Sequence, residues 1–332
     1  MLHVLAVLAA AVLFGTTGTS QALGPDGTTP LSVGAVRMVI GGTGLAVLAF
    51  ALAGRHRRRH PSAGRPRAGI RPVLLMALTG LCLAVYQPLF FLGTARNGVA
   101  VSTVIALGSA PVLAGLLEWP LTRRLPSTTW MAATGLATVG VVLLGLGGAS
   151  GSGGTDPLGV AGAIGAGASF AVFTNVQRRL LDAGWDAFTV VGGMGVSSAL
   201  VSAAALPLID ASWIGQPRGL VMALWLGLAT TAIAYVLFTW GLQRLSAATA
   251  ATLTLGEPLT ATLLGVTVLG ERLSVAALAG VLVLAAGLAL LARGASRARG
   301  SSPSPDSPAS HHAPHESPAP TRERTGDSRA DW

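Results

Sequence analysis

Three ionisable side chains, Arg37, Glu118 and Glu257, interrupt long apolar stretches of the sequence. If these stretches cross a membrane, each charge is a functional candidate, because a charge near the bilayer centre costs at least ~2.5 kcal/mol on insertion scales. Glu257 lies about ten residues, or ~15 Å, from either end of the stretch 247–269, which is the depth of the bilayer midplane. A carboxylate there could bind a proton, a cation or a cationic group of a substrate.

The residues around Glu257 favour a polar site over a lipid-facing surface. Small and polar residues share its helical face, namely Ala250, Thr254, Glu257, Ala261 and Gly265. Pro258 has no N–H to donate, so we expect it to break the helix and to leave the Thr254 carbonyl without its partner. The predicted site therefore contains Glu257 and Thr254. The alternative is a structural carboxylate bound to a neighbouring helix.

The other two charges lie nearer to the ends of their apolar stretches. Arg37 lies about six residues, or ~9 Å, below the outer edge of the stretch 31–52. It could extend outwards as an anchor, or inwards towards Glu257, where it would hold a gate or attract an anionic substrate. Glu118 lies close to the inner surface, little more than a turn before Arg123 and Arg124. We expect it to form an interfacial ion pair.

Uncharged residues complete the candidate site. Tyr and Trp could stack on an organic substrate, although near helix ends they are also typical of the membrane interface. Tyr86 and Gln87 lie deeper in their stretch than the other candidates, and Pro111 is a second expected helix break. The remaining candidates are Thr16, Thr17, Gln21, Asn175, Tyr235 and Trp240.

The composition indicates that membrane helices position these residues. Of 332 residues, 51% are hydrophobic and only 11% are charged, and the mean hydropathy is +0.64. A soluble domain has roughly 25% charged residues, so a soluble enzyme or a nucleic-acid-binding domain is excluded despite the net charge of +9. We expect an all-α polytopic membrane protein whose ten spans are 3–23, 31–52, 73–93, 98–118, 128–147, 158–177, 187–208, 219–240, 247–269 and 273–292. The first stretch has a competing interpretation as a cleaved signal peptide, although no basic residue precedes it.

Arginine predicts the orientation, because the chain has no lysine. With both termini in the cytoplasm, the inner loops hold most of the arginines, and the basic loop 53–72 lies near anionic lipid. The outer loops hold only Arg96, Arg218 and Arg272. The tail 294–332 is rich in Ser, Pro and charge, so we expect it to be disordered.

The chain consists of two similar halves. Phe90, Gly93 and Pro111 recur at nearly the same spacing as Phe238, Gly241 and Pro258. Five spans per half place the second half in the opposite orientation. The predicted units are therefore inverted repeats at 1–148 and 158–293, an architecture typical of secondary carriers.

The sequence resembles the drug/metabolite transporter superfamily, specifically EamA-type carriers with ten helices and two EamA repeats. The resemblance is carried by Leu-Phe-Gly-Thr-Thr at 13–17, Val-Arg at 36–37, Pro111, Gly-Glu-Pro at 256–258, Gly-Glu-Arg-Leu-Ser at 270–274, Gly280 and Gly287. One departure is Arg123-Arg124, where the first repeat of the family often has Gly-Glu. The resemblance implies a cytoplasmic-membrane carrier of small metabolites or drugs, often an exporter. The inverted repeats predict that it works by alternating access, and a midplane carboxylate at Glu257 would allow proton coupling or exchange.

Other classes of protein fit the sequence less well. It has no catalytic residue set, no metal-ligand cluster and no Walker loop, so we expect no enzyme activity, no cofactor, no metal and no nucleic-acid partner. The expected partners are a small-molecule substrate, membrane lipid and protons, and the expected state is a monomer or homodimer. The alternatives are a permease subunit of a larger transport complex and a membrane-embedded enzyme. A central cavity lined by the first, third, fourth, sixth and ninth spans is also predicted.

Overall fold

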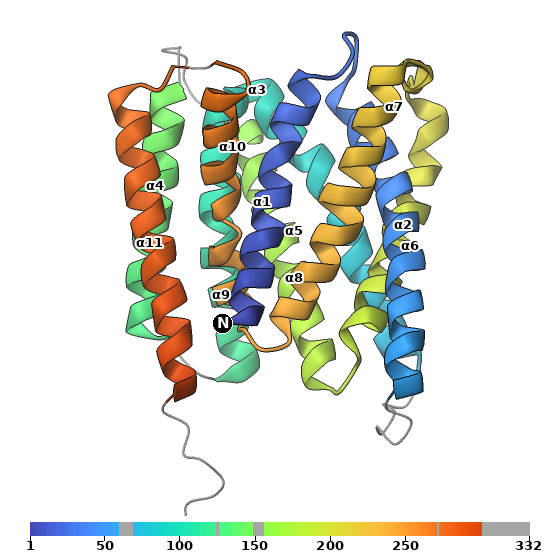
Figure 1. The fold of residues 1–332 in the computed structure, drawn as a ribbon, viewed down its shortest axis with the longest axis vertical. Helices are drawn as coiled ribbons and strands as arrows, with labels where there is room; N and C mark the ends of the chain where they lie inside the picture. Colours follow the sequence, from blue (N-terminus) through green and yellow to red (C-terminus); the bar gives the residue numbers. More distant parts are fainter. Residues whose placement is uncertain (60–68, 124–125, 149–155, 271, 301–332) are drawn as a thin grey trace, which may run out of the picture.

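The computed structural model describes residues 1–59, 69–123, 126–148, 156–270 and 272–300, and within them every regular element is helical. The helices stand side by side as one bundle (Figure 1). They are α1 (Leu2–Ala22), α2 (Pro30–Arg59), α3 (Ile70–Thr122), α4 (Thr128–Gly148), α5 (Pro157–Asp182), α6 (Ala187–Ala205), the short turns η1 (Leu206–Leu208) and η2 (Ser212–Gly215), α7 (Pro217–Leu224), the π-helix η3 (Trp225–Ile233), α8 (Ala234–Leu242), α9 (Ala247–Leu253), α10 (Gly256–Thr267) and α11 (Val275–Gly300).

Eight helical segments of the described chain are long and apolar enough to cross a membrane. Each has at least 19 residues, and the mean hydropathy of its most apolar window lies between 1.5 and 2.6. About 20 apolar residues match the hydrocarbon thickness of a bilayer. The protein is therefore a multi-pass membrane protein, as the composition predicted.

Gly98 divides α3, the longest helix, into two parts. Its 53 residues would extend ~80 Å if straight, more than twice the bilayer core. Gly98 adopts φ 77° and ψ 161°, a conformation that is open essentially only to glycine. Tyr86 and Leu107, on opposite sides of Gly98, line the same cavity, so the two parts fold against each other.

The predicted helix break at Pro111 is wrong. Pro88, Pro111 and Pro120 all lie inside α3, and Gly98 is its one residue with non-helical dihedral angles. Proline is tolerated in membrane helices because neighbouring groups compensate for the hydrogen bond it removes. A glycine with positive φ reverses the chain direction here, and a proline, with φ near −65°, could not do so.

Gly98→Ala should destabilise the protein by about 1–3 kcal/mol, because the added Cβ makes this backbone conformation unfavourable. Thermal unfolding in detergent measures the loss. Gly135→Ala is the matched control, because Gly135 lies within α4 with open space around its Cβ position. That control should be neutral or slightly stabilising. Equal unfolding temperatures for the two variants would contradict the role of Gly98.

Small residues allow the helices to pack closely. α5 packs against α3, α2 against α6, and α4 against α11. At the last interface a Cβ added to Gly140 would lie 2.5 Å from the backbone nitrogen of Leu284. One added to Gly280 would lie 2.8 Å from the carbonyl oxygen of Gly140. Such contacts are typical of membrane helices, where association depends on van der Waals packing.

Two helices extend beyond their predicted ends. α2 continues to Arg59, so the first part of the predicted basic loop 53–72 is helical. α11 continues to Gly300, so residues 294–300 are helical and do not belong to a disordered tail. Arginine is a good helix former and its charge is favourable near a helix C-terminus, so helices can extend past the apolar stretch. The rest of the predicted tail, 301–332, lies outside the described residues.

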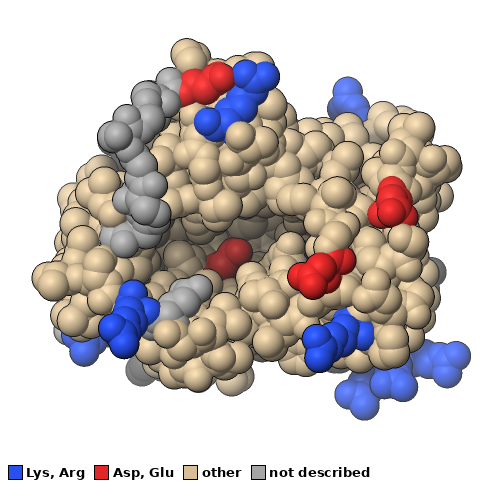
Figure 2. All heavy atoms as spheres, turned by 90° about the horizontal axis from the view of Figure 1, so that it is seen from above, with Lys and Arg blue, Asp and Glu red and all other residues tan. Residues whose placement is uncertain are grey.

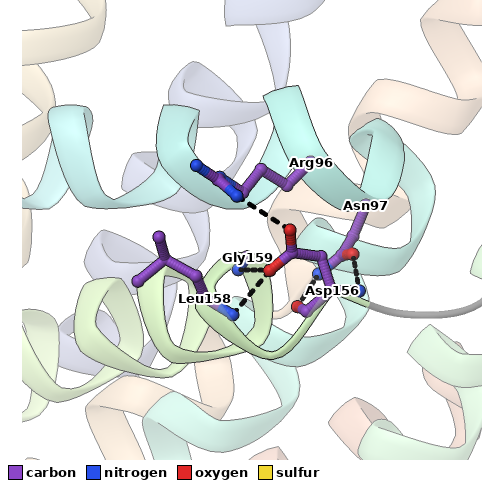
Figure 3. A network of polar contacts seen from close by, with 5 residues as sticks. All are labelled: Arg96, Asn97, Asp156, Leu158 and Gly159. Atoms are coloured by element: carbon purple, nitrogen blue, oxygen red, sulfur yellow. Dashed lines mark hydrogen bonds and ion pairs between the residues drawn. The ribbon is translucent and has the colours of Figure 1, made fainter.

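A polar clamp joins the turn of α3 to the start of α5 (Figure 3). Arg96 forms an ion pair with Asp156 at 2.8 Å. The Asn97 side chain donates to the Asp156 carbonyl at 3.0 Å and accepts from its N–H at 2.7 Å. Asp156 also caps α5 by accepting from the N–H of Leu158 at 2.7 Å. These contacts connect the first predicted half to the residue that caps α5, the first helix of the second half.

The clamp predicts a pH-dependent contribution to stability. The hydrogen bond from Arg96 and the backbone N–H groups hold the pKa of Asp156 below its ordinary value of 3.8. A carboxyl group with a lowered folded-state pKa stabilises the protein above its unfolded pKa, and this contribution is lost as the pH falls through the folded pKa. Asp156→Asn should therefore lower the unfolding temperature at neutral pH and have a smaller effect below about pH 4. Arg96→Gln should reproduce this pattern. If the variants lower the unfolding temperature by the same amount at every pH, the proposed contribution of the Asp156 carboxylate is wrong.

Candidate functional site: a central cavity at Glu257

The helix break next to Glu257 positions the site. α9 ends at Leu253 and α10 begins at Gly256, so the predicted stretch 247–269 is divided near its middle. Glu257 and Pro258 lie in the first turn of α10, where proline is tolerated because no N–H is needed. The positive end of the helix dipole also favours the Glu257 carboxylate there.

The prediction of a free Thr254 carbonyl is wrong. This oxygen accepts a hydrogen bond from the Glu257 N–H at 2.9 Å. The chain tightens into a turn before α10, and this turn supplies a donor three residues away in place of the one that Pro258 lacks. Thr254 itself lines the central cavity with Glu257, and its hydroxyl donates to the Ala251 carbonyl at 2.7 Å.

Glu257 lines a cavity at the centre of the bundle. A narrow chamber of about 70 Å³ continues into a vestibule of about 340 Å³, and Arg37, Tyr86, Gln87 and Glu257 line both. The vestibule extends to the ends of α1 and α2 and the turn of α3. Figure 2 views this face from above and shows a hollow with an acidic side chain inside it. The lining residues come from all five predicted spans, and also from α2 and α8.

The Glu257 carboxylate faces this cavity. Within the described part of the chain it has neither a hydrogen bond nor an ion pair, so no bond to a neighbouring helix accounts for it. α1 is in close contact with the backbone beside it. A Cβ added to Gly15 would lie 2.7 Å from the Glu257 carbonyl oxygen and 2.6 Å from Thr260.

Arg37 is buried and bound to the π-helix η3. Its side chain donates from Nε to Thr231 Oγ1 at 3.0 Å and from Nη2 to the Thr230 carbonyl at 3.3 Å. Arg37 is only 8% exposed, so it does not extend to the membrane surface. Among the described residues no ion pair joins it to Glu257. The cavity therefore contains an acidic and a basic side chain that are not in direct contact.

Aromatic side chains form the apolar wall of the chamber, and most of them were missed in the sequence. Phe14 lies 5.1 Å from Tyr235 between ring centroids, and Phe170 lies 5.1 Å from Phe173. All four residues line the chamber. Phe170 and Phe173 are three positions apart on α5, a spacing that places two rings on one helix face. This spacing was the available signal, but an ordinary packed core shows the same pattern.

The cavity includes some of the predicted residues and excludes others. Tyr86, Gln87, Thr17 and Gln21 line it. The side chains of Thr16, Asn175 and Trp240 lie elsewhere. Thr16 accepts from Trp225 Nε1 at 3.0 Å, Asn175 donates to the Ala114 carbonyl at 3.1 Å, and Trp240 stacks on His3 with centroids 4.4 Å apart.

The ion pair expected for Glu118 is not formed within the described residues, which include Arg123 but not Arg124. The carboxylate instead accepts a hydrogen bond from the N–H of Ala248 at 2.8 Å. Ala248 lies in the first turn of α9, where backbone N–H groups lack helical partners. Glu118 therefore caps a helix of the second half, a contact that sequence distance concealed.

Comparison with known proteins decides the family. The family model of the EamA-like transporter family matches residues 1–146 and again residues 157–293. The chain belongs to this family. It is 40% identical over 285 residues to the uncharacterized transporter YwfM of Bacillus subtilis (strain 168), covering 84% of this chain and 90% of YwfM. A known crystal structure has the same fold, with a TM-score of 0.72 and 22% identity over 89% of this chain and 98% of the other. The EamA family is part of the drug/metabolite transporter superfamily that the sequence resembles.

Proposed function

We propose that this protein is a secondary carrier that exports small organic molecules across the cytoplasmic membrane by alternating access. One observation carries the proposal: the Glu257 carboxylate has no hydrogen-bond or ion-pair partner among the described residues, and it faces the same cavity as the buried Arg37. A charge retained in a membrane span without a structural partner is typical of a transport pathway. Glu257 would bind a proton or a substrate amine, and Arg37 would attract an anionic group.

The proposed architecture has ten spans in two inverted repeats, 1–148 and 158–293. The two parts of α3 count as separate spans, and α9 with α10 makes one broken span, which raises the eight long segments to ten. The double match of the family model supports two repeats. In Figure 1 the N-terminus and the end of α11 lie on the same side of the bundle, as an even number of spans requires.

Alternating access would use contacts between the proposed repeats. The cavity opens towards the loop between α1 and α2. At the opposite end Asn175 binds the Ala114 carbonyl and Glu118 binds the Ala248 N–H, and both contacts connect one repeat to the other. If these two contacts break while the cavity closes at the α1–α2 loop, Glu257 becomes accessible from the opposite membrane surface. Inverted repeats allow this exchange because each half can adopt the conformation of the other.

Two measurements test the proposal. Comparing metabolites released by cells with and without the protein identifies the substrate class and the direction of transport. The purified protein in liposomes should then move that substrate without ATP and without another protein. A strict requirement for ATP or for a partner would overturn the proposal in favour of a permease subunit.

The proposed orientation predicts a labelling pattern. In a Cys82→Ala background, Asp26→Cys lies in the exposed loop before α2, and Ala183→Cys lies in the exposed turn after α5. With both termini in the cytoplasm, a membrane-impermeant thiol reagent applied to intact cells should label only the first variant. Labelling of both after permeabilisation is the control. The reverse pattern in intact cells would refute the orientation.

A further inference from the structure

A second hollow lies on the side of the bundle, outside the central cavity. This lateral groove runs between α1, α10 and the helix formed by α7 and the start of η3, and has a volume of about 580 Å³. The labelled helices α1, α7 and α10 can be followed in Figure 1. Its walls are mainly apolar, formed by Leu23, Val221, Trp225, Leu264 and Val268. Three of these side chains, Leu23, Val221 and Val268, are at least half exposed, so the groove is open towards the lipid phase.

The two ends of the lateral groove differ in polarity. Arg218, in the first turn of α7, and Ser20 of α1 lie at the end near the membrane surface. Within the described residues the Arg218 side chain has no hydrogen bond and no ion pair. At the deep end the indole N–H of Trp225 donates to Thr16 Oγ1 at 3.0 Å, so its one polar atom is satisfied. A cation therefore lies above a hydrocarbon-lined channel that extends ~10 Å along α1, from Thr16 to Leu23.

We propose that the lateral groove binds an anionic phospholipid, with its phosphate at Arg218 and one acyl chain between α1, α7 and α10. The apolar walls match an acyl chain, and the exposed Arg218 guanidinium matches the charge of an anionic headgroup. A zwitterionic lipid fits the apolar walls equally well, but its headgroup has no net charge and is attracted less strongly to the Arg218 guanidinium. The proposal does not depend on transport activity, because it concerns a different surface.

Occupancy of the lateral groove would also affect the central site. Thr16 lines the groove, whereas Thr17, the next residue of α1, lines the vestibule. α1 therefore separates the two, and at Gly15 it contacts the backbone of Glu257. A bound acyl chain would hold this part of α1 against α10.

Quenching of Trp225 by lipids with brominated acyl chains tests the proposal. The full-length protein is placed in phosphatidylcholine nanodiscs with increasing fractions of brominated phosphatidylglycerol or brominated phosphatidylcholine. Subtracting the fluorescence of the Trp225→Phe variant leaves the emission of Trp225 alone. Brominated phosphatidylglycerol should quench the fluorescence of Trp225 at a lower lipid fraction than brominated phosphatidylcholine does. Arg218→Gln should weaken that preference about fivefold, the effect of roughly one basic side chain near a membrane surface. Arg272→Gln, another exposed arginine on the predicted outer side, should leave it unchanged.

A groove-filling variant provides an independent test. Ser20→Phe should abolish selective quenching while the unfolding temperature is retained. Val47→Phe, on a surface of α2 where Val47 is 67% exposed, should not affect it. Equal quenching by the two lipids in the wild type would indicate ordinary lipid contact and overturn the proposal. Selective quenching that persists in Ser20→Phe would overturn it as well.

Discussion

Glu257→Gln should abolish the pH dependence of transport, or transport itself, while the protein remains folded and inserted. Glutamine preserves the shape of the side chain but cannot ionise, and its NH2 group cannot accept a hydrogen bond as the carboxylate oxygen does. If the carboxylate binds a substrate amine, losing a hydrogen bond to a charged group, worth about 1.5–3 kcal/mol, should lower transport roughly tenfold or more. If it carries a proton, uptake into liposomes should lose its response to an imposed pH gradient. The transport rate and its response to the pH gradient are both measured with the substrate identified by the metabolite comparison.

Glu118→Gln is the matched control for Glu257→Gln. Glu118 is the other carboxylate within the long apolar stretches, but it caps α9 and lies outside the central cavity. The amide oxygen of glutamine can still accept from Ala248, so this variant should keep the pH dependence and lose at most some thermal stability. If Glu257→Gln transports with an unchanged rate and pH profile, Glu257 is structural and the proposed coupling is wrong.

Arg37→Lys should impair both stability and transport, although it retains the charge. The guanidinium binds Thr231 and the Thr230 carbonyl at the same time, from two different nitrogens. The ammonium group of lysine lacks this planar geometry. Two hydrogen bonds from a charged donor, each worth about 1.5–3 kcal/mol, are at risk in a buried position. We expect a clearly lower unfolding temperature and at least about a tenfold loss of transport.

Arg57→Lys is the matched control, because Arg57 is exposed and, among the described residues, donates one side-chain hydrogen bond, to Thr189 at 3.0 Å. This variant should have little effect on the unfolding temperature or on transport.

Thr231→Val separates the anchoring of Arg37 from the attraction of substrate. It removes one contact of the guanidinium and leaves the charge facing the cavity. If Thr231→Val reduces transport as much as Arg37→Lys does, Arg37 acts only by holding η3. Wild-type behaviour of Arg37→Lys would refute any role for the guanidinium geometry.

Local physical chemistry explains why the helices and the position of Glu257 could be predicted. The transfer free energy of apolar side chains acts along each segment separately, so the composition and the apolar stretches indicated a multi-pass helical protein. The placement of Glu257 near the middle of its stretch followed from its distance to the two ends, and the break between α9 and α10 lies beside it. The resemblance carried by short motifs, such as Gly-Glu-Pro at 256–258, indicated the EamA family, and the family match confirmed it.

The tertiary structure decided which groups meet, because partner choice depends on atoms far apart in the sequence. Arg37 could have contacted Glu257 or the membrane surface, but it binds threonines of η3, 194 residues away. Glu118 lies little more than a helical turn before two arginines in sequence, yet its partner is a backbone N–H 130 residues away. The turn at Gly98 and the aromatic wall at Phe170 and Phe173 likewise depend on how the two parts of α3 and α5 pack. Periodicity within one segment determines that a helix forms and which face is polar, but only packing between segments determines what that face contacts.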